Sequence, residues 1–164
     1  MAEKRFRRRK RLREKETTAL VETLEAAFGR APFEPGDDVD RAEGDGIDAL
    51  YAHGEIVALL VEGTPVPSVR GLLRATPSRR AVTVDAGAVP HVYNGADVMA
   101  PGIVEADPEV TEGDFVWVRD EKNGVPLAVG RALLPGPEMV AADRGRAVAT
   151  LHHVGDAIWK EDEA

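Results

Sequence analysis

Apolar and polar residues alternate with a helical period in the first part of the chain. Large apolar side chains recur about every four residues from Leu20 to Phe28, which predicts an amphipathic helix. Thr17 or Thr18 is placed to cap the start of this helix, and Gly29 is placed to end it. We therefore expect a helix that packs one face against a core.

The pattern changes twice before the middle of the chain. Residues 30–46 are rich in proline, glycine and aspartate, which favours a loop. Residues 56–61 form a short apolar run rich in branched side chains, which predicts a buried strand. Pro67 or Ser68 then begins a short second helix. These elements together predict a small α/β unit.

From Ala81 onward, short β-type segments are separated by glycines. Residues 115–118 and 127–129 flank Asn123-Gly124, and this dipeptide is a strong signal for a hairpin. Several short strands at this spacing indicate a small barrel or sandwich. The sequence therefore predicts an α+β protein whose second half is rich in strands.

Charge is distributed very unevenly. Residues 1–15 hold nine basic and two acidic side chains, whereas the rest of the chain holds 12 basic and 27 acidic ones. A dense carboxylate surface is typical of proteins from a high-salt cytoplasm, and an ordinary acidic protein is the alternative. Residues 4–15 are too basic for the first turn of a helix, where the helix dipole favours negative charge. We expect an arm or a short edge strand there.

Motifs for catalysis or cofactor binding are not found. The sequence has no Gly-x-Ser-x-Gly elbow, no phosphate-binding loop and no dinucleotide fingerprint. It has no cysteine, and the adjacent His152 and His153 would point to opposite faces of a strand. Asp85 and Asp97 could form a carboxylate pair, but chance produces such pairs in a chain with 30% charged residues. We expect no enzymatic activity, no cofactor and no metal.

The chain also lacks the patterns of a membrane or exported protein. No apolar run approaches the roughly 20 residues that a membrane span needs. The N-terminus carries charges where a signal peptide needs an apolar stretch. We expect a cytoplasmic protein with no membrane partner.

Six segments in the second half resemble the motifs of PUA domains, which are named for pseudouridine synthases and archaeosine transglycosylases. Their order over about eighty residues matches the order in that family. In this sequence the segments are Asp85–Ala88, Gly95–Asp97, Pro101–Ile103, Glu112–Val116, Leu127–Ala132 and His152–Trp159.

The first half is similar to the pre-PUA half of archaeal proteins related to the malignant T-cell-amplified translation factor. It departs from the usual Pro-Thr-Leu-Arg motif, since Ser68 and Val69 stand in Pro67–Arg70. The resemblance implies an α+β fold, with an N-terminal α/β pre-PUA domain and a C-terminal PUA β-pseudobarrel. The expected divisions are a basic arm at 1–15, the pre-PUA domain at 16–80 and the PUA domain at 81–160.

The resemblance also implies an RNA-binding groove between the first helix of the PUA domain and the strand that follows it. Small residues there would let RNA approach the backbone, Met99 and Ile103 could pack on an exposed base, and Arg131 could contact phosphate. The expected RNA-binding residues are His91, Asn94, Gly95, Ala96, Asp97, Met99, Pro101, Gly102, Ile103 and Arg131. The alternative for the glycines is turn geometry, and for Met99 and Ile103 it is a place in the core.

The basic N-terminus is the second candidate contact with RNA, because arginine binds phosphate in a bidentate manner. Its residues are Arg5, Arg7, Arg8, Arg9, Lys10, Arg11 and Arg13. The alternative is a solvated tail.

Three functions are consistent with these features. The first is binding of tRNA, at its acceptor end, or rRNA during translation initiation or recycling, with the small ribosomal subunit and a protein of initiation-factor fold as partners. The second is an accessory tRNA-binding subunit of a tRNA-modifying enzyme such as an archaeosine transglycosylase. The third is a protein-interaction module without RNA binding, because acidic residues outnumber basic ones by 15 to 6 in residues 81–164.

Overall fold

The computed structural model describes residues 5–163. Contacts between Cα atoms divide these residues into two compact units. The first comprises residues 5–77 together with 160–163, and the second comprises residues 78–159. Among the described residues, no helix is long and apolar enough to cross a membrane.

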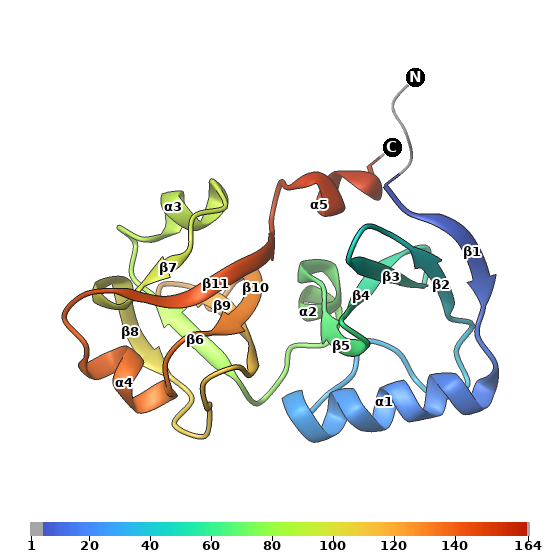
Figure 1. Cartoon of the computed structure of the whole chain (residues 1–164), viewed down its shortest axis with the longest axis horizontal. Coiled ribbons are helices and arrows are strands. Elements are labelled where there is room, and N and C mark those ends of the chain that lie inside the picture. Colours follow the sequence, from blue (N-terminus) through green and yellow to red (C-terminus); the bar gives the residue numbers. More distant parts are fainter. Residues whose placement is uncertain (1–4, 164) are drawn as a thin grey trace. The chain divides into compact units, whose positions relative to one another are not determined.

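The first unit is built on an antiparallel five-stranded sheet in which each strand pairs with its neighbour in sequence (Figure 1). Helix α1 contacts β5, and helix α2 contacts both β4 and β5. The strands are β1 (Arg7–Arg11), β2 (Asp40–Glu43), β3 (Ile47–Ala52), β4 (Glu55–Val61) and β5 (Thr64–Pro67), and the helices are α1 (Glu14–Phe28) and α2 (Val69–Arg74).

Helix α1 begins earlier than the sequence pattern predicts. The prediction of a cap at Thr17 or Thr18 is wrong, because the helix begins at Glu14 and Thr17 is buried within it. The backbone N–H of Arg13 donates to the Glu16 carboxylate at 3.0 Å, which satisfies a donor at the helix start. The predicted end at Gly29 is confirmed, with a left-handed φ of 88°.

Three other predictions for this unit have different outcomes. Residues 30–46 are not a loop throughout, since Asp40–Glu43 form β2. The predicted strand at 56–61 is confirmed as part of β4. The predicted helix start at Ser68 is also confirmed, because Ser68 is the N-cap of α2. The Ser68 hydroxyl accepts from the backbone N–H of Gly71 at 3.0 Å and donates to the carbonyl of Ile56 at 2.7 Å. Ser68 therefore joins α2 to β4.

The second unit contains a six-stranded sheet in the order β7-β11-β10-β9-β6-β8. All its pairs are antiparallel except β6 with β9. Its strands are β6 (Ala81–Val84), β7 (Val98–Met99), β8 (Ile103–Ala106), β9 (Phe115–Asp120), β10 (Pro126–Ala132) and β11 (Arg146–His153). Its helical segments are α3 (Val89–Tyr93), η1 (Ala100–Gly102), α4 (Gly136–Ala141) and α5 (Ala157–Glu161), the last of which continues into the first unit.

The core of the second unit is formed by buried residues of these strands together with Val92, Ala100 and Met139 of the helical segments. Trp117 is fully buried on β9, and its indole N–H donates to the carbonyl of Arg79 at 2.9 Å. The predicted hairpin is confirmed, since β9 and β10 pair on either side of residues 121–125 and Gly124 has a φ of 68°. The predicted α+β fold class is confirmed by the two units together.

Asp156 closes the second unit after β11. Burial raises the pKa of its carboxyl group. The hydrogen bond and the charge of His152, with the backbone N–H groups of Trp159 and His153, outweigh that effect and lower the pKa to about 2. The His152 ring is buried, and its Nδ1 lies 2.8 Å from the carboxylate. These contacts hold the end of β11 and the start of α5 together.

Candidate functional site

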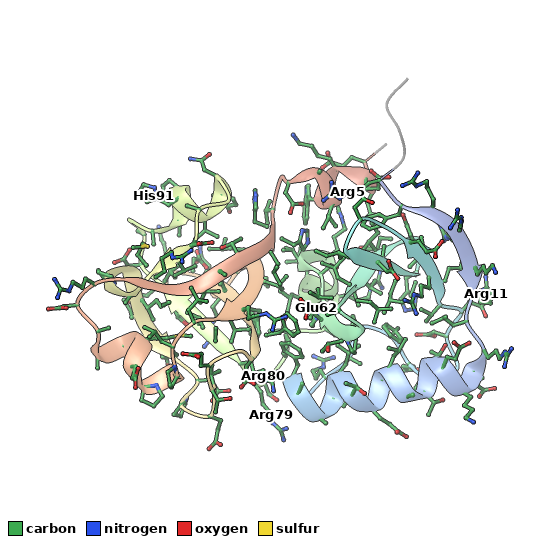
Figure 2. The ribbon with its side chains drawn as sticks, viewed as in Figure 1. Arg5, Arg11, Glu62, Arg79, Arg80 and His91 are labelled. Carbon is green, nitrogen blue, oxygen red and sulfur yellow. The ribbon has the colours of Figure 1, made fainter. Side chains whose placement is uncertain are left out.

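A pocket of about 630 Å³ lies in the second unit between α3, the segment that follows it, and η1. Figure 2 labels His91 on α3, at one wall of this pocket. Six of the ten residues predicted to bind RNA line the pocket, namely His91, Ala96, Asp97, Met99, Pro101 and Gly102. Most of the lining is apolar. The polar groups are therefore few, and their positions define what the pocket can bind.

Gly95 shapes the pocket without lining it. It follows α3 with a φ of 82°, and the N–H groups of Gly95 and Ala96 donate to the carbonyls of Val92 and His91, both at 3.0 Å. This pair of bonds is a Schellman ending, which requires a left-handed residue. A Cβ at Gly95 would also lie 2.9 Å from Nε2 of His153. Glycine is thus needed here for turn geometry and for packing.

Gly102 permits a close approach between η1 and the start of α3. A Cβ at Gly102 would lie 2.9 Å from the Cβ of Ala88. The N–H of Asp85 donates to the carbonyl of Gly102 at 2.9 Å, and the Asp85 carboxylate accepts from the N–H of Ala88 at 2.9 Å. Asp85 therefore stabilises the backbone at one end of the pocket. Asp85 is one of the two carboxylates noted as a possible pair in the sequence, and its contacts here are structural.

Asp97 and Arg146 form the charged edge of the pocket. Nη1 of Arg146 donates to Oδ2 of Asp97 at 3.0 Å, and the N–H of Thr150 donates to Oδ1 at 3.0 Å. The Arg146 side chain is 63% exposed, so its remaining donors face solvent. Arg146 was not among the predicted residues. It lies 49 residues from Asp97 in sequence, and the pairing of β11 with β7 brings them together.

Met99 and Ile103 have opposite surroundings. Met99 is 48% exposed on β7 and pairs in register with Arg146. Ile103 is 6% exposed and belongs to the core cluster of the unit, so its side chain does not line the pocket. The prediction that Ile103 packs on a base is therefore not consistent with its position, because strand residues alternate between faces.

Asn94 and Arg131 also lie outside the pocket lining. Asn94 is exposed at the C-terminal end of α3. Arg131 lies on β10, and its guanidinium is 4.5 Å from the centroid of the Phe115 ring. Arg131 covers an aromatic ring on the neighbouring strand, and its contact with phosphate stays a prediction. The cation that lines the pocket is Arg146.

The basic N-terminal residues belong to the first unit. Residues 7–11 form β1, the edge strand of its sheet, and this corresponds to the edge-strand alternative rather than to a separate arm. Arg13 follows at the start of α1. Figure 2 labels Arg5 and Arg11 before and at the end of β1. Phe6 is buried, so the start of the strand is anchored in the core.

Comparison with known proteins agrees with this fold. The profile of the PUA domain family matches residues 80–154. An uncharacterized protein of Methanocaldococcus jannaschii is 38% identical over 156 residues, which cover 94% of this chain and 96% of that protein. The crystal structure of a hypothetical protein from Pyrococcus horikoshii OT3 superposes with a TM-score of 0.84 at 38% identity, over 93% of this chain and 98% of that one. The chain belongs to the PUA-domain family.

A third relative links this PUA-domain protein to translation by name. Translation machinery-associated protein 20 of Schizosaccharomyces pombe is 32% identical over 117 residues, which cover 68% of this chain and 65% of that protein. The resemblance to archaeal PUA proteins related to the malignant T-cell-amplified family is confirmed by these matches. PUA domains bind RNA, and this chain carries one in residues 80–154.

The residues described in the structure offer no metal centre. Within residues 5–163, no three histidine or acidic side chains gather in a way that could hold a metal ion. In the pocket, the Asp97 carboxylate is engaged by Arg146 and by a backbone N–H group. The pocket thus combines an apolar lining with the ion-paired guanidinium of Arg146 at its edge.

Proposed function

We propose that this protein binds structured RNA and that the pocket beside α3 accepts an exposed nucleotide at an RNA end. The observation that carries this proposal is the combination of an apolar pocket of about 630 Å³ with a single oriented guanidinium at its edge. Proteins read RNA at single-stranded ends, where bases pack on side chains and phosphates meet cations.

The pocket divides these two tasks between neighbouring residues. Met99 exposes an apolar side chain on β7 for contact with a base. Arg146, opposite it in register, keeps donors for a phosphate because Asp97 engages only part of its guanidinium. Gly102 and Ala96 leave room for the sugar and backbone to approach.

We place this activity in translation. The named relatives are translation-associated proteins, which supports binding of tRNA, at its acceptor end, or of small-subunit rRNA during initiation or recycling. A protein of initiation-factor fold is the partner we propose for the complex on the small ribosomal subunit, in the cytoplasm. The protein acts by binding RNA and not by catalysis.

Crosslinking in cells, followed by sequencing of the attached RNA, tests this function. We expect enrichment of tRNA acceptor ends or small-subunit rRNA, and loss of that enrichment in an Arg146→Ala, Met99→Ala copy. A Lys122→Ala, Val140→Ala copy is the matched control, because it removes one cation and one exposed apolar side chain outside the pocket. Enrichment no greater than for a protein that does not bind RNA would contradict the proposal.

Purification of the protein from cells, with identification of the proteins and ribosomal subunits that come with it, separates the alternative function. If the protein co-purifies with a base-exchange enzyme instead of ribosomal subunits, it is an accessory subunit for tRNA modification. The comparisons support that alternative less, because the relatives that match most of the chain and carry a functional name are named for translation.

We also propose that the acidic surface is an adaptation to a high-salt cytoplasm. The net charge of the chain is −8 despite the basic N-terminus. At molar salt the screening length is about 3 Å, so carboxylates repel RNA much less than in dilute buffer. Stability should then rise with potassium chloride. Full folding and solubility in low-salt buffer, with no gain on adding the salt, would refute this adaptation.

A further inference from the structure

A second cleft, of about 550 Å³, lies in the first unit along β1, β2 and the start of α1. Five basic side chains and two carboxylates line it. The remainder of the protein is strongly acidic, so this concentration of cations along β1, β2 and the start of α1 is a distinct feature. Arg8 and Arg41 pair with Glu43 and Asp48. The other basic residues in and beside the cleft fall into two groups with different surroundings.

The first group is held by carboxylates of the neighbouring strand. Nε of Arg11 lies 2.6 Å from one oxygen of Asp40, and Nε of Arg9 lies 2.9 Å from the other. The hydrogen bond from Arg11 lowers the pKa of the Asp40 carboxyl group, against the effect of burial. The Arg9 guanidinium also lies 4.0 Å from the centroid of the Tyr51 ring. Arg9 and Arg11 therefore fasten β1 to the sheet.

The second group consists of Lys10 and Arg13, which line the cleft. Among residues 5–163, neither has a carboxylate within ion-pair distance of its side-chain nitrogens. Glu16 shares the cleft, and its carboxylate accepts from the backbone N–H of Arg13. The charges of Lys10 and Arg13 are thus available to an anionic ligand.

We propose that this cleft is a second RNA-contact site in which Lys10 and Arg13 bind backbone phosphates, while Arg9 and Arg11 only hold the strand that carries them. The inference rests on the proposed RNA binding and assigns the electrostatic contact to two residues of the basic segment. Cations that neutralise phosphates release counterions, so they strengthen binding in a salt-dependent way without reading sequence.

The test compares the unchanged protein with a Lys10→Ala, Arg13→Ala variant. Affinity for purified tRNA and for small-subunit rRNA is measured at several potassium chloride concentrations. Loss of two phosphate contacts should reduce the slope of log affinity against log salt by about 1.4 to 1.8. A Lys122→Ala, Arg144→Ala variant is the control, because it removes two exposed charges from the second unit. The control should keep the slope of the unchanged protein.

The thermal unfolding midpoint of each variant shows whether a change in affinity reflects unfolding. The inference is overturned if the unchanged protein binds RNA and the Lys10→Ala, Arg13→Ala variant keeps its slope, or if the control loses as much. The inference is also overturned if an acidic protein binds to the cleft and RNA does not, and if the Lys10→Ala, Arg13→Ala variant loses that protein binding. Failure of the unchanged protein to bind either RNA would instead contradict the proposed function.

Discussion

Arg146 donates from Nη1 to Oδ2 of Asp97 at 3.0 Å across 49 residues of sequence. The other oxygen of Asp97 accepts from the N–H of Thr150, so a hydrogen bond holds the carboxylate against β11. The carboxylate in turn orients the guanidinium of Arg146, which pairs in register with Met99. This relationship places the cation of the pocket next to its exposed apolar side chain. In the proposed function, this arrangement would let a strongly acidic protein offer RNA one oriented cation beside an apolar side chain.

Arg146→Ala should weaken RNA binding with little effect on folding. Loss of one phosphate contact should reduce the slope of log affinity against log salt by about 0.7 to 0.9. The ion pair is exposed, so its loss should cost no more than about 1 kcal/mol of stability. Fluorescence titrations at several salt concentrations measure the slope. A slope equal to that of the unchanged protein would show that Arg146 does not contact phosphate, and Lys122→Ala is the control for a general charge effect.

Met99→Ala should weaken binding in a way that salt does not change. Loss of packing on a base should cost about 1 kcal/mol, or about a fivefold loss of affinity. Val140→Ala removes another exposed apolar side chain, on α4 and outside the pocket lining, and should leave affinity unchanged. Equal effects of the two substitutions would mean that the pocket is not where the base lies.

Gly95→Ala should destabilise the second unit more than Gly113→Ala. Both glycines have a left-handed φ, of 82° and 93°, which costs an alanine about 1 kcal/mol. Only at Gly95 would the new Cβ also meet His153, whereas nothing lies within 4 Å at Gly113. The midpoint of urea unfolding, followed by fluorescence, measures the difference. Both tryptophans, Trp117 and Trp159, belong to this unit. Equal losses of stability in the two variants would show that the His153 side chain moves away from the new Cβ at no cost in free energy.

Asp156→Asn should remove a pH-dependent part of the stability. The folded pKa of Asp156, about 2, lies below the usual unfolded value of about 3.9. The carboxylate therefore stabilises the fold fully above the unfolded pKa, by about 2 kcal/mol, and this is lost as the pH falls through the folded pKa. In urea unfolding, the difference between the two proteins should be largest above pH 5 and should shrink toward pH 2. A difference that stays constant over this range would contradict the assignment.

Arg9→Ala, Arg11→Ala should lower the unfolding midpoint of the first unit, because β1 loses its contacts with Asp40 and Tyr51. Lys10→Ala, Arg13→Ala should leave that midpoint nearly unchanged, since neither side chain has a carboxylate partner among the described residues. Far-ultraviolet circular dichroism during heating measures both variants. Equal losses of stability would mean that the two groups of cations do not differ in structural role.

Local sequence signals predicted the elements whose causes are local. Gly29 ends α1, Ser68 begins α2, and Asn123-Gly124 marks the hairpin, because each depends on a few neighbouring residues. The start of α1 was misplaced because Glu14 and Glu16 favour the helix start more strongly than the threonines do. Strand β2 was hidden in a segment whose composition is that of a loop.

The site was predicted only in part, for a related reason. The motifs around Gly95 and Gly102 lie close together in sequence, and the residues predicted from them make up half of the pocket lining. Arg146 comes from a strand at the other end of the unit, and only the pairing of β11 with β7 brings it to Met99. In the basic segment, the sequence shows the number of charges, but which of them are already paired depends on Asp40 in the folded sheet.

Nuclear magnetic resonance can show directly whether the pocket beside α3 receives an RNA end. The chain of 17.6 kDa is small enough for backbone assignment. A tRNA acceptor-stem hairpin with a single-stranded 3′ end would be titrated into the labelled protein. We expect the largest chemical-shift changes at Ala96, Met99, Gly102 and Arg146. Changes confined to other surfaces, such as the hairpin at 121–125, with none at these residues, would contradict it.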